Sequence, residues 1–148
     1  MSWEDHIKSL TDTKNVKDAA IIEYASSSFC GVSPGFNLTN HSVELEDEKG
    51  AKHSAIVDEL KILQQLVDNK GIVPSPPGIW LNKVKYHLIK WDDELRVAYL
   101  KCPTGGATVM RTNIVIIVGT WDKDQNKGAG NCNLAITTLG ETFLGVGY

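Results

Sequence analysis

The chain has 148 residues, of which 42% are apolar and 22% charged, and a formal charge of −3 from 15 basic and 18 acidic side chains. This size and composition are typical of one globular domain that buries its own core, and the acidic balance argues against nucleic-acid binding through a basic surface. The longest apolar run, residues 114–118, is much shorter than the ~20 residues that span a bilayer.

The first predicted element is an amphipathic helix near the N-terminus. Ser2 is a suitable N-cap with Asp5 three residues later, which is the spacing of a capping box. Trp3, Ile7 and Leu10 then recur at helical spacing, so they would share one face of a helix of about three turns.

A β-hairpin is expected next, after a break at Asn15. Residues 19–22 are apolar and would form a buried strand, residues 26–28 are three serines that favour a turn, and residues 29–32 would return as a short strand.

The following segment has two open interpretations. Residues 43–46 alternate, Lys49-Gly50 favours a turn and residues 52–56 could pair back, which together predict a solvated hairpin. The alternative is a disordered acidic loop. Residues 57–67 then predict a helix, because Leu60, Leu63 and Val67 fall on one face before Gly71.

The second half of the chain is mainly β in character, after a rigid connector at Pro74–Gly78 that we do not expect to serve as a PxxP ligand. Its strand-like segments are separated by short turns, which favours an antiparallel meander because parallel strands need longer crossovers. A final helix is expected over residues 132–144, where Thr137, Thr138 and Gly140 make it dependent on packing. The predicted strands are 80–81, 83–89, 95–100, 107–111 and 113–121.

Large aromatic residues lie near both ends of the chain, at Trp3 and Tyr148. Chain ends usually fray, so we expect both segments to dock on the body of the protein. Two docked helices could place these rings side by side and form a shallow apolar platform for a partner.

Catalytic and metal-binding patterns are missing from the sequence. The four histidines and three scattered cysteines do not have metal-ligand spacing, and residues 44–49 lack the glycine and closing glutamate of a calcium loop. Gly128-Ala129-Gly130 is an isolated GxG that we interpret as a loop. We therefore expect a binding module with no cofactor and no metal, not an enzyme, and reduced thiols in a cytoplasmic protein without a signal peptide.

Six stretches follow one another in a common order: 2–7, 18–22, 78–81, 85–89, 104–109 and 130–148. Together they resemble the profilin family, and they cover most of the chain outside about residues 36–70. The resemblance implies an α/β fold of the α+β type, with a central antiparallel sheet, N- and C-terminal helices on one face and a further helix on the other, in one profilin-like domain over residues 1–148. The stretch at about 40–57 departs from the family because it is longer than usual and acidic, which suggests an extended acidic hairpin or loop.

The resemblance implies a function and a set of partners. Profilins bind monomeric actin, promote its nucleotide exchange and present it to proline-rich assembly factors, and many bind phosphoinositides. A cytoplasmic, cytoskeleton-associated regulator of actin filament assembly is therefore expected. By position, the actin-binding residues would be Lys101, Thr108, Arg111, Lys127, Gly130 and Asn133.

A groove for proline-rich ligands is also implied by the resemblance, because flat aromatic rings bind rigid polyproline II segments. Trp3 and Tyr148 hold matching places, whereas His6 replaces the family's tyrosine, Phe29 replaces a tryptophan and Thr142 lies where vertebrate members carry histidine. The lost hydrogen-bond donors lead to the hypothesis that proline-rich binding is weak or absent.

One further departure from the family pattern is at Asn82-Lys83, which replaces a glycine pair, so this turn must differ. Two other functions remain as alternatives. One is a phosphoinositide or membrane-surface binding module that uses Lys83, Lys85, Lys90 and Lys101. The other is a small-ligand sensor, which would need a deep pocket in the meander.

Overall fold

The computed structural model describes residues 2–126 and 128–148 of the chain, as three helices and nine strands. In chain order these are α1 (Trp3–Asp12), β1 (Ala19–Glu23), β2 (Phe29–Val32), β3 (Asn40–Glu46), β4 (Lys52–Asp58), α2 (Glu59–Asp68), β5 (Ile79–Leu81), β6 (Val84–Asp92), β7 (Val97–Cys102), β8 (Gly105–Arg111), β9 (Val115–Asp122) and α3 (Ala129–Gly145).

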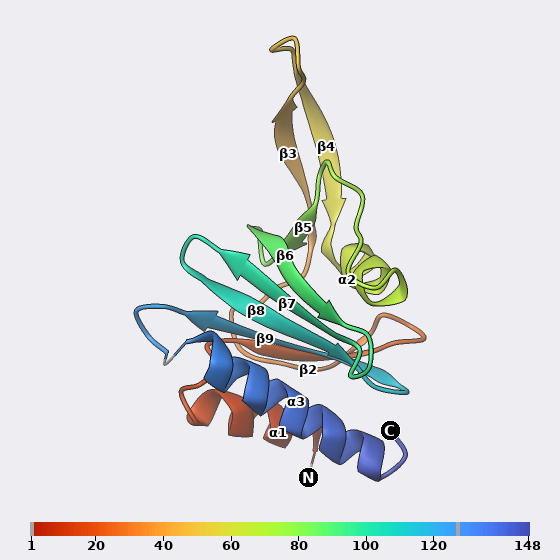
Figure 1. The fold of residues 1–148 in the computed structure, drawn as a ribbon, viewed down its shortest axis with the longest axis vertical. Helices are drawn as coiled ribbons and strands as arrows, with labels where there is room; N and C mark the ends of the chain where they lie inside the picture. Colours follow the sequence, from red (N-terminus) through yellow and green to blue (C-terminus); the bar gives the residue numbers. More distant parts are fainter. Residues whose placement is uncertain (1, 127) are drawn as a thin grey trace.

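Seven strands form one antiparallel sheet in the order β2-β1-β9-β8-β7-β6-β5. The pairing of β1 with β9 joins two segments that are distant in sequence. Helices α1 and α3 lie on one face of this sheet and α2 lies against the other (Figure 1). The predicted antiparallel sheet, with its terminal helices on one face and a third helix on the other, is confirmed.

The N-terminal helix begins as the sequence predicts. The Ser2 side chain accepts a hydrogen bond from the Asp5 backbone N–H at 3.1 Å, and the Asp5 carboxylate accepts one from the Ser2 N–H at 3.0 Å. These reciprocal bonds satisfy two N–H groups that a helix start otherwise leaves unpaired. They also lower the pKa of Asp5 from its ordinary value.

Two predicted helix starts were wrong by a few residues. The helix expected from Val57 begins at Glu59, because Val57 pairs with His41 in β4 and the Asp58 side chain caps the helix through the Lys61 N–H at 3.2 Å. The last helix, expected from Cys132, begins earlier at Ala129. Local patterns locate such elements well and their ends poorly.

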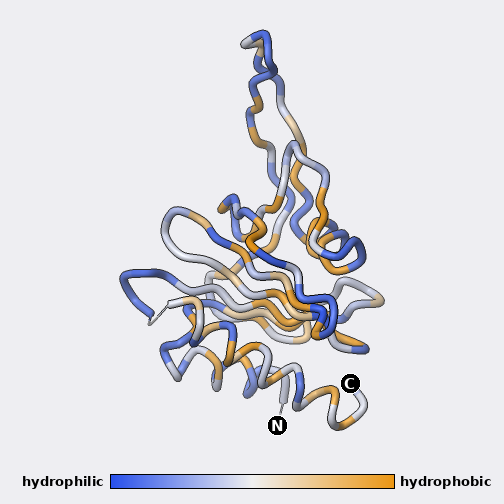
Figure 2. The backbone as a smooth tube through the Cα atoms, in the orientation of Figure 1, coloured by the Kyte–Doolittle hydropathy of each residue, from blue (hydrophilic) through white to orange (hydrophobic). Residues whose placement is uncertain are grey.

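Strands β3 and β4 form a separate two-stranded hairpin that projects from the body (Figure 1). Its register runs without a break from the Asn40–Asp58 pair at the base to the Glu46–Lys52 pair near the tip. Residues at the hairpin tip are mostly hydrophilic in Figure 2, whereas hydrophobic residues are concentrated in the central strands of the main sheet. This segment is therefore ordered by strand pairing rather than by a core of its own.

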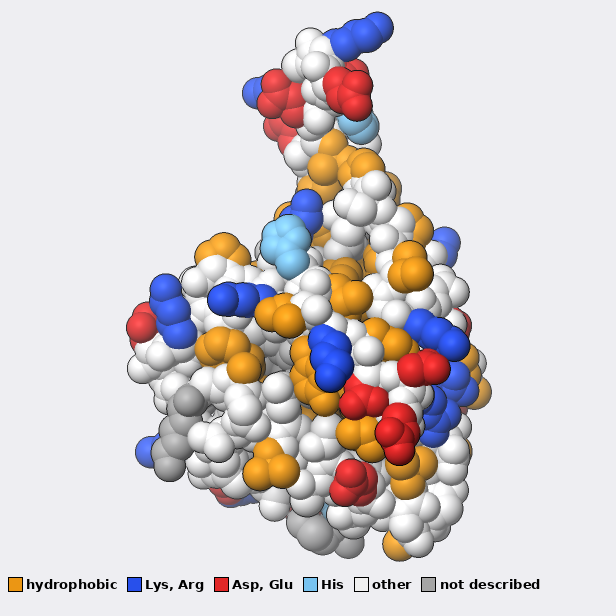
Figure 3. Space-filling model, viewed as in Figure 1, with side chains coloured by type: hydrophobic (Ala, Val, Ile, Leu, Met, Phe, Trp, Pro, Cys, Tyr) orange, Lys and Arg blue, Asp and Glu red, His pale blue; other side chains and the backbone are white. Residues whose placement is uncertain are grey.

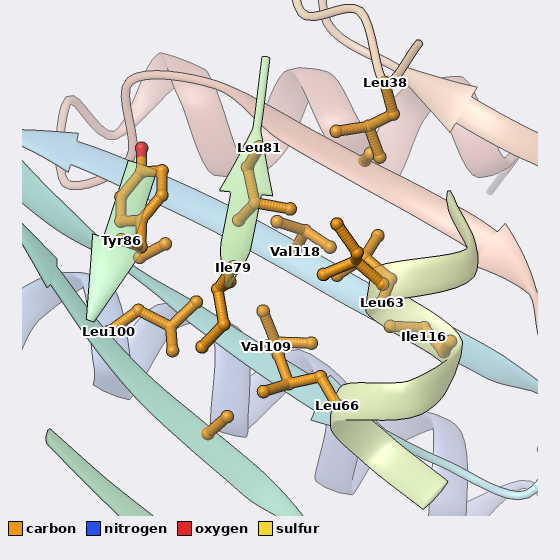
Figure 4. Packing of buried hydrophobic residues seen from close by; sticks show 14 of the residues in the cluster. Leu38, Leu63, Leu66, Ile79, Leu81, Tyr86, Leu100, Val109, Ile116 and Val118 are labelled. Carbon is orange, nitrogen blue, oxygen red and sulfur yellow. The ribbon is translucent and has the colours of Figure 1, made fainter. Parts of the chain in front are cut away.

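The core is divided by the sheet into two layers. On the α2 side, leucines of the helix pack against alternating side chains of β5, β8 and β9, as Figure 4 shows for Leu63, Leu66, Val109 and Val118. On the other side, α1 and α3 pack on the opposite side chains of β1, β8 and β9. Burial of these apolar side chains supplies the main driving force for folding.

A buried carboxylate joins the hairpin, α2 and the β5–β6 turn. The Glu59 side chain is completely buried and accepts hydrogen bonds from the N–H groups of Asn82 at 2.7 Å, Lys83 at 2.8 Å and Thr39 at 3.3 Å. His41 Nε2 lies 2.8 Å from its second oxygen. Asn82 and Lys83 have φ of 49° and 62°, a left-handed backbone conformation that favours glycine. The Glu59 carboxylate stabilises this conformation because it accepts hydrogen bonds from the N–H groups of both residues.

None of the described helices is long and apolar enough to cross a membrane. Within residues 2–126 and 128–148, no three His, Cys, Asp or Glu side chains are grouped so that they could hold a metal ion.

Candidate functional site

An apolar depression with cationic side chains at its edge lies where four strands meet the start of α3. We call it the sheet-end hollow; its volume is about 470 Å³. The strand register brings its residues together, because Lys90 is opposite Tyr99, and Leu100 is opposite Ala107. Its lining residues are Ile89, Lys90, Tyr99, Leu100, Lys101, Ala107, Trp121, Ala129 and Asn133.

Lys101 and Asn133 are the two predicted actin-contact residues that line this hollow. Thr108 was expected on the same surface, and that expectation is wrong, because its side chain is fully buried. Its hydroxyl instead donates a hydrogen bond to the Asn133 side-chain oxygen. Thr108 therefore orients Asn133 from beneath and does not itself face solvent.

The other predicted contact residues are less close to the hollow. Gly130 is exposed in the first turn of α3, next to the lining residue Ala129. Arg111 lies at the far end of β8, where its guanidinium stacks over the Tyr24 ring at 3.8 Å, so the structure does not bring it to the hollow. Lys127 lies outside the described residues.

The sequence did not single out Ile89, Tyr99 or Trp121 as site residues. Ile89 is 63% exposed on β6, and the adjacent apolar residues 88–89 in a half-solvated strand were a signal that could have found it. Trp121 of β9 is paired with Gly106 of β8, and a Cβ on Gly106 would come within 2.7 Å of the Trp121 Nε1. The glycine therefore makes room for the indole that forms one wall of the hollow.

A second site lies at the other end of the terminal helices. The rings of Trp3, His6, Phe143 and Tyr148 form one group, which we call the aromatic cluster. Phe143 is buried at its centre, 5.4 Å from Trp3, 5.0 Å from His6 and 6.2 Å from Tyr148 between ring centroids. Trp3 and Tyr148 are 6.0 Å apart. A small depression of about 190 Å³ lies between Ser2, Trp3, His6 and Tyr148.

Tyr148 is held in this cluster by its own backbone. Its N–H donates to the Phe143 carbonyl at 2.8 Å, and its carbonyl accepts from the Ile114 N–H at 2.8 Å. Tyr148 as a whole residue stays 44% exposed. The last residues are thus docked on the sheet while the aromatic surface faces solvent.

Two residues that were predicted for a proline-rich groove, Phe29 and Thr142, do not line the small depression of the aromatic cluster. Thr142 is exposed on α3 and shares with His6 a longer depression between α1 and α3. Phe29 is 42% exposed on β2 and lines neither depression. Phe143, which was not predicted for the groove, is the central ring of the aromatic cluster.

The basic side chains on the face shown in Figure 3 are interspersed with hydrophobic, neutral and acidic side chains. Lys90 and Lys101 flank the sheet-end hollow, whereas Lys83 and Lys85 lie at the β5–β6 turn. This distribution resembles the mixed rim of a protein interface more than a single cationic patch.

The profilin family model matches residues 1–148. A curated profilin from Tetrahymena pyriformis is 29% identical over 156 aligned residues, which cover 99% of this chain and 98% of that protein. Among solved structures, a profilin from Schizosaccharomyces pombe is 25% identical with a TM-score of 0.71, and profilin IB from Acanthamoeba castellanii is 22% identical with a TM-score of 0.75. Each alignment covers 99% of this chain and all of the other.

Proposed function

The chain belongs to the profilin family, and from this premise we propose that it binds monomeric actin and regulates the assembly of actin filaments. One solved neighbour, a profilin named LokiProfilin2, is in complex with rabbit actin; it is 13% identical with a TM-score of 0.67. A sequence identity of 13% supports a shared fold and no shared function. The proposal of actin binding therefore depends on the residues of this chain.

The sheet-end hollow is the observation on which the proposal depends. It combines an apolar interior with an exposed Ile89 at its edge and two cations, Lys90 and Lys101. A desolvated apolar centre inside a polar rim is the usual anatomy of a protein interface. The rim cations suit a partner with acidic groups, because complementary charges steer association.

The proposed contact set is smaller than the sequence suggested. Lys101 and Asn133 would contact actin directly, and Gly130 would allow close backbone approach at the exposed first turn of α3. Thr108 would act through its hydrogen bond to Asn133. Arg111, which stacks on Tyr24, is left out of the set.

Spontaneous polymerisation of actin in the presence of increasing protein tests this function. We expect dose-dependent slowing, and we expect Ile89→Asp or Lys101→Glu to weaken the effect about tenfold, since a buried apolar contact or a charge reversal each changes affinity by about 1.4 kcal/mol. Lys61→Glu is the matched control, because Lys61 is exposed on α2 away from the hollow. If no actin responds, including that of the source organism, the proposal fails.

We further propose that the bound protein accelerates exchange of the actin nucleotide. Release of a fluorescent ATP analogue from actin measures this directly. A wild-type protein that slows assembly without changing the release rate would limit its role to sequestering monomers.

Proline-rich ligands would bind only weakly at the aromatic cluster. Mouse profilin IIa is known in complex with a double repeat from the FH1 domain of mDia1, and here Phe29 and Thr142 lie outside the depression that Trp3, His6 and Tyr148 share. Titration with ten-residue polyproline, monitored by tryptophan fluorescence, tests this. The chain has four tryptophans, so Trp3→Phe is needed to assign the signal. Tight, saturable binding would contradict the proposal.

A further inference from the structure

The projecting hairpin has an open edge on each side, because β3 and β4 pair only with each other in the part of the chain that the structure describes. Among the same residues, the backbone of residues 52–57 forms hydrogen bonds only with β3. A strand at the edge of a sheet directs a row of N–H and C=O groups outward. The outer edge of β4 can therefore pair with a further strand.

Strand β4 lacks the features that usually prevent pairing at an edge. Its register with β3 is unbroken, so no β-bulge turns the edge away, and its sequence contains no proline. Its Lys and Asp side chains, Lys52 and Asp58, lie at its two ends. Ile56 is 72% exposed, and hydrophobic side chains are visible on the hairpin below its charged tip (Figure 3). A long, regular edge with an exposed apolar side chain is a site of association.

The sequence of β4 is complementary to itself. When two copies of β4 run antiparallel about Ala55, Lys52 of each copy lies opposite Asp58 of the other. Ile56 lies opposite Ser54 of the second copy, so the two Ile56 side chains are diagonal neighbours on one face, within reach of each other at ~7–8 Å. This pairing covers the exposed isoleucine and places opposite charges together at both ends.

The outer edge of β3 is not complementary to itself in this way. Two copies of β3 that run antiparallel about Val43 bring their Glu44 side chains to diagonal positions on one face. Glu46 then lies opposite Asn40 and gains no cation. Like charges on neighbouring strands destabilise their pairing, so the charges favour the β4 edge.

Pairing of β4 with β3 of a second copy is excluded by the size of the body. In that arrangement both hairpins point the same way, and the two bodies are separated by two strand spacings, ~10 Å. The main sheet has seven strands and is therefore ~30 Å wide at ~4.8 Å per strand, so the bodies would overlap. Antiparallel pairing of β4 with β4 points the hairpins in opposite directions and places the bodies at opposite ends.

We propose that two copies of this chain associate through β4 into a two-fold symmetric dimer, with a four-stranded sheet in the order β3-β4-β4-β3. The contact involves one seven-residue strand from each copy, which is small for a protein interface, so the dimer is weak and depends on protein concentration. The inference goes beyond the proposed function and does not depend on it, because no residue of β4 lines the sheet-end hollow.

Sedimentation equilibrium over a wide range of protein concentration tests the association. We expect a reversible monomer–dimer equilibrium, and small-angle scattering of the dimer should show two bodies joined by an extended connection. Ile56→Lys places two cations at diagonal positions and should weaken the dimer about tenfold or more. Ser42→Lys is the matched control, because Ser42 is exposed and paired with Ile56 but lies on the outer strand. It should leave the association unchanged, and thermal unfolding checks that both variants are folded.

Cross-linking tests the register of the pairing. Opposed residues of antiparallel strands have Cα atoms ~4.5–5.5 Å apart, which a disulfide can bridge. Oxidised Ala55→Cys should therefore form a covalent dimer that a thiol reductant releases. Ser42→Cys is the control, since the two copies of residue 42 are three strand spacings apart in the dimer, ~14 Å. Wild type treated in parallel accounts for any cross-link through the half-buried Cys30.

Four results would overturn the proposal. The first is a monomer at every concentration, and the second is cross-linking of Ser42→Cys in place of Ala55→Cys, which would assign the contact to β3. The third is a dimer that Ile56→Lys leaves unchanged, which would place the contact on another surface. The fourth is growth beyond a dimer, which would indicate stacked hairpins. None of these results changes the expectation for actin polymerisation, so the two proposals succeed or fail separately.

Discussion

The two faces of the main sheet are covered in chemically different ways. On one face α2 is anchored by polar side chains at both of its ends, and on the other α1 and α3 are fitted by apolar packing around small residues. The difference teaches which kind of substitution each face can tolerate. On the α2 face, a substitution that keeps the side-chain shape but changes its polar groups should lower the free energy of unfolding. On the face of the terminal helices, a substitution that adds side-chain volume should lower it.

The α2 face depends on groups at the first and last residues of the helix. Glu59, at its start, accepts hydrogen bonds from the backbone of two other segments. Asp68, at its end, accepts a hydrogen bond from the Tyr24 hydroxyl, and Arg111 stacks over the same tyrosine ring. The hydrogen bond raises the pKa of Tyr24 above its usual value. These contacts fix the position of α2 between the ends of strands.

On the opposite face, close packing of α3 on the sheet requires glycine at two positions. A Cβ on Gly140 of α3 would lie 2.2 Å from the Met110 sulfur, and one on Gly119 of β9 would lie 2.5 Å from Ile136 Cδ1. Cys132 is completely buried in this layer, and burial raises the pKa of its thiol to about 11. The helix packs so closely on the sheet that a single methyl group has no free space.

The largest expected effect is on the α2 face. Glu59→Gln keeps the side-chain shape but replaces one of the two acceptor oxygens with an amide NH₂, so the buried donors that face that position lose their acceptor. We expect the free energy of unfolding to fall by about 3 kcal/mol, measured by urea denaturation. Glu44→Gln, at an exposed position of β3, should change it by less than about 0.5 kcal/mol. Equal stability of wild type and Glu59→Gln would show that the carboxylate does not anchor this face.

A smaller loss is expected from added volume under α3. Gly140→Val forces Met110 out of its position, which costs about 2 kcal/mol by overpacking. Gly145→Val is the control on the same helix, because a Cβ there would have no neighbour within 4 Å. The same denaturation experiment compares them. If the two variants lose equal stability, helix propensity and not packing controls this face.

The smallest effect is expected at the exposed end of α2. Tyr24→Phe removes the hydrogen bond to Asp68 and should cost about 0.5 kcal/mol, since the contact is open to solvent. The folded pKa of Tyr24 is raised, so its contribution is complete below pH 10 and is lost as the pH rises through the folded value. Thermal unfolding measured from pH 7 to 11 should show the difference in Tm between wild type and Tyr24→Phe becoming smaller as the pH rises. Tyr148→Phe, at an exposed tyrosine on the opposite face of the sheet from α2, serves as the control.

The candidate sites were only partly predictable. Lys101 and Asn133, both predicted as actin contacts by position along the chain, line the same hollow. The burial of Thr108 and the separation of Arg111 from that surface could not be read from the sequence, because both depend on how β8 lies between its neighbours. The same holds for Phe143, whose burial at the centre of the aromatic cluster requires both terminal helices to be in place.

The sequence by itself determined the elements with strong local signals. The Ser2–Asp5 capping box, the first hairpin and the alternating strands of the meander all form from neighbouring residues, whose hydrogen bonds and periodicity are local properties. Only the tertiary structure decided the site of the Glu59 carboxylate, the wall that Trp121 forms beside Gly106 and the junction that His6 makes between two depressions. Each of these joins segments far apart in the chain, and such contacts exist only once the sheet has been assembled.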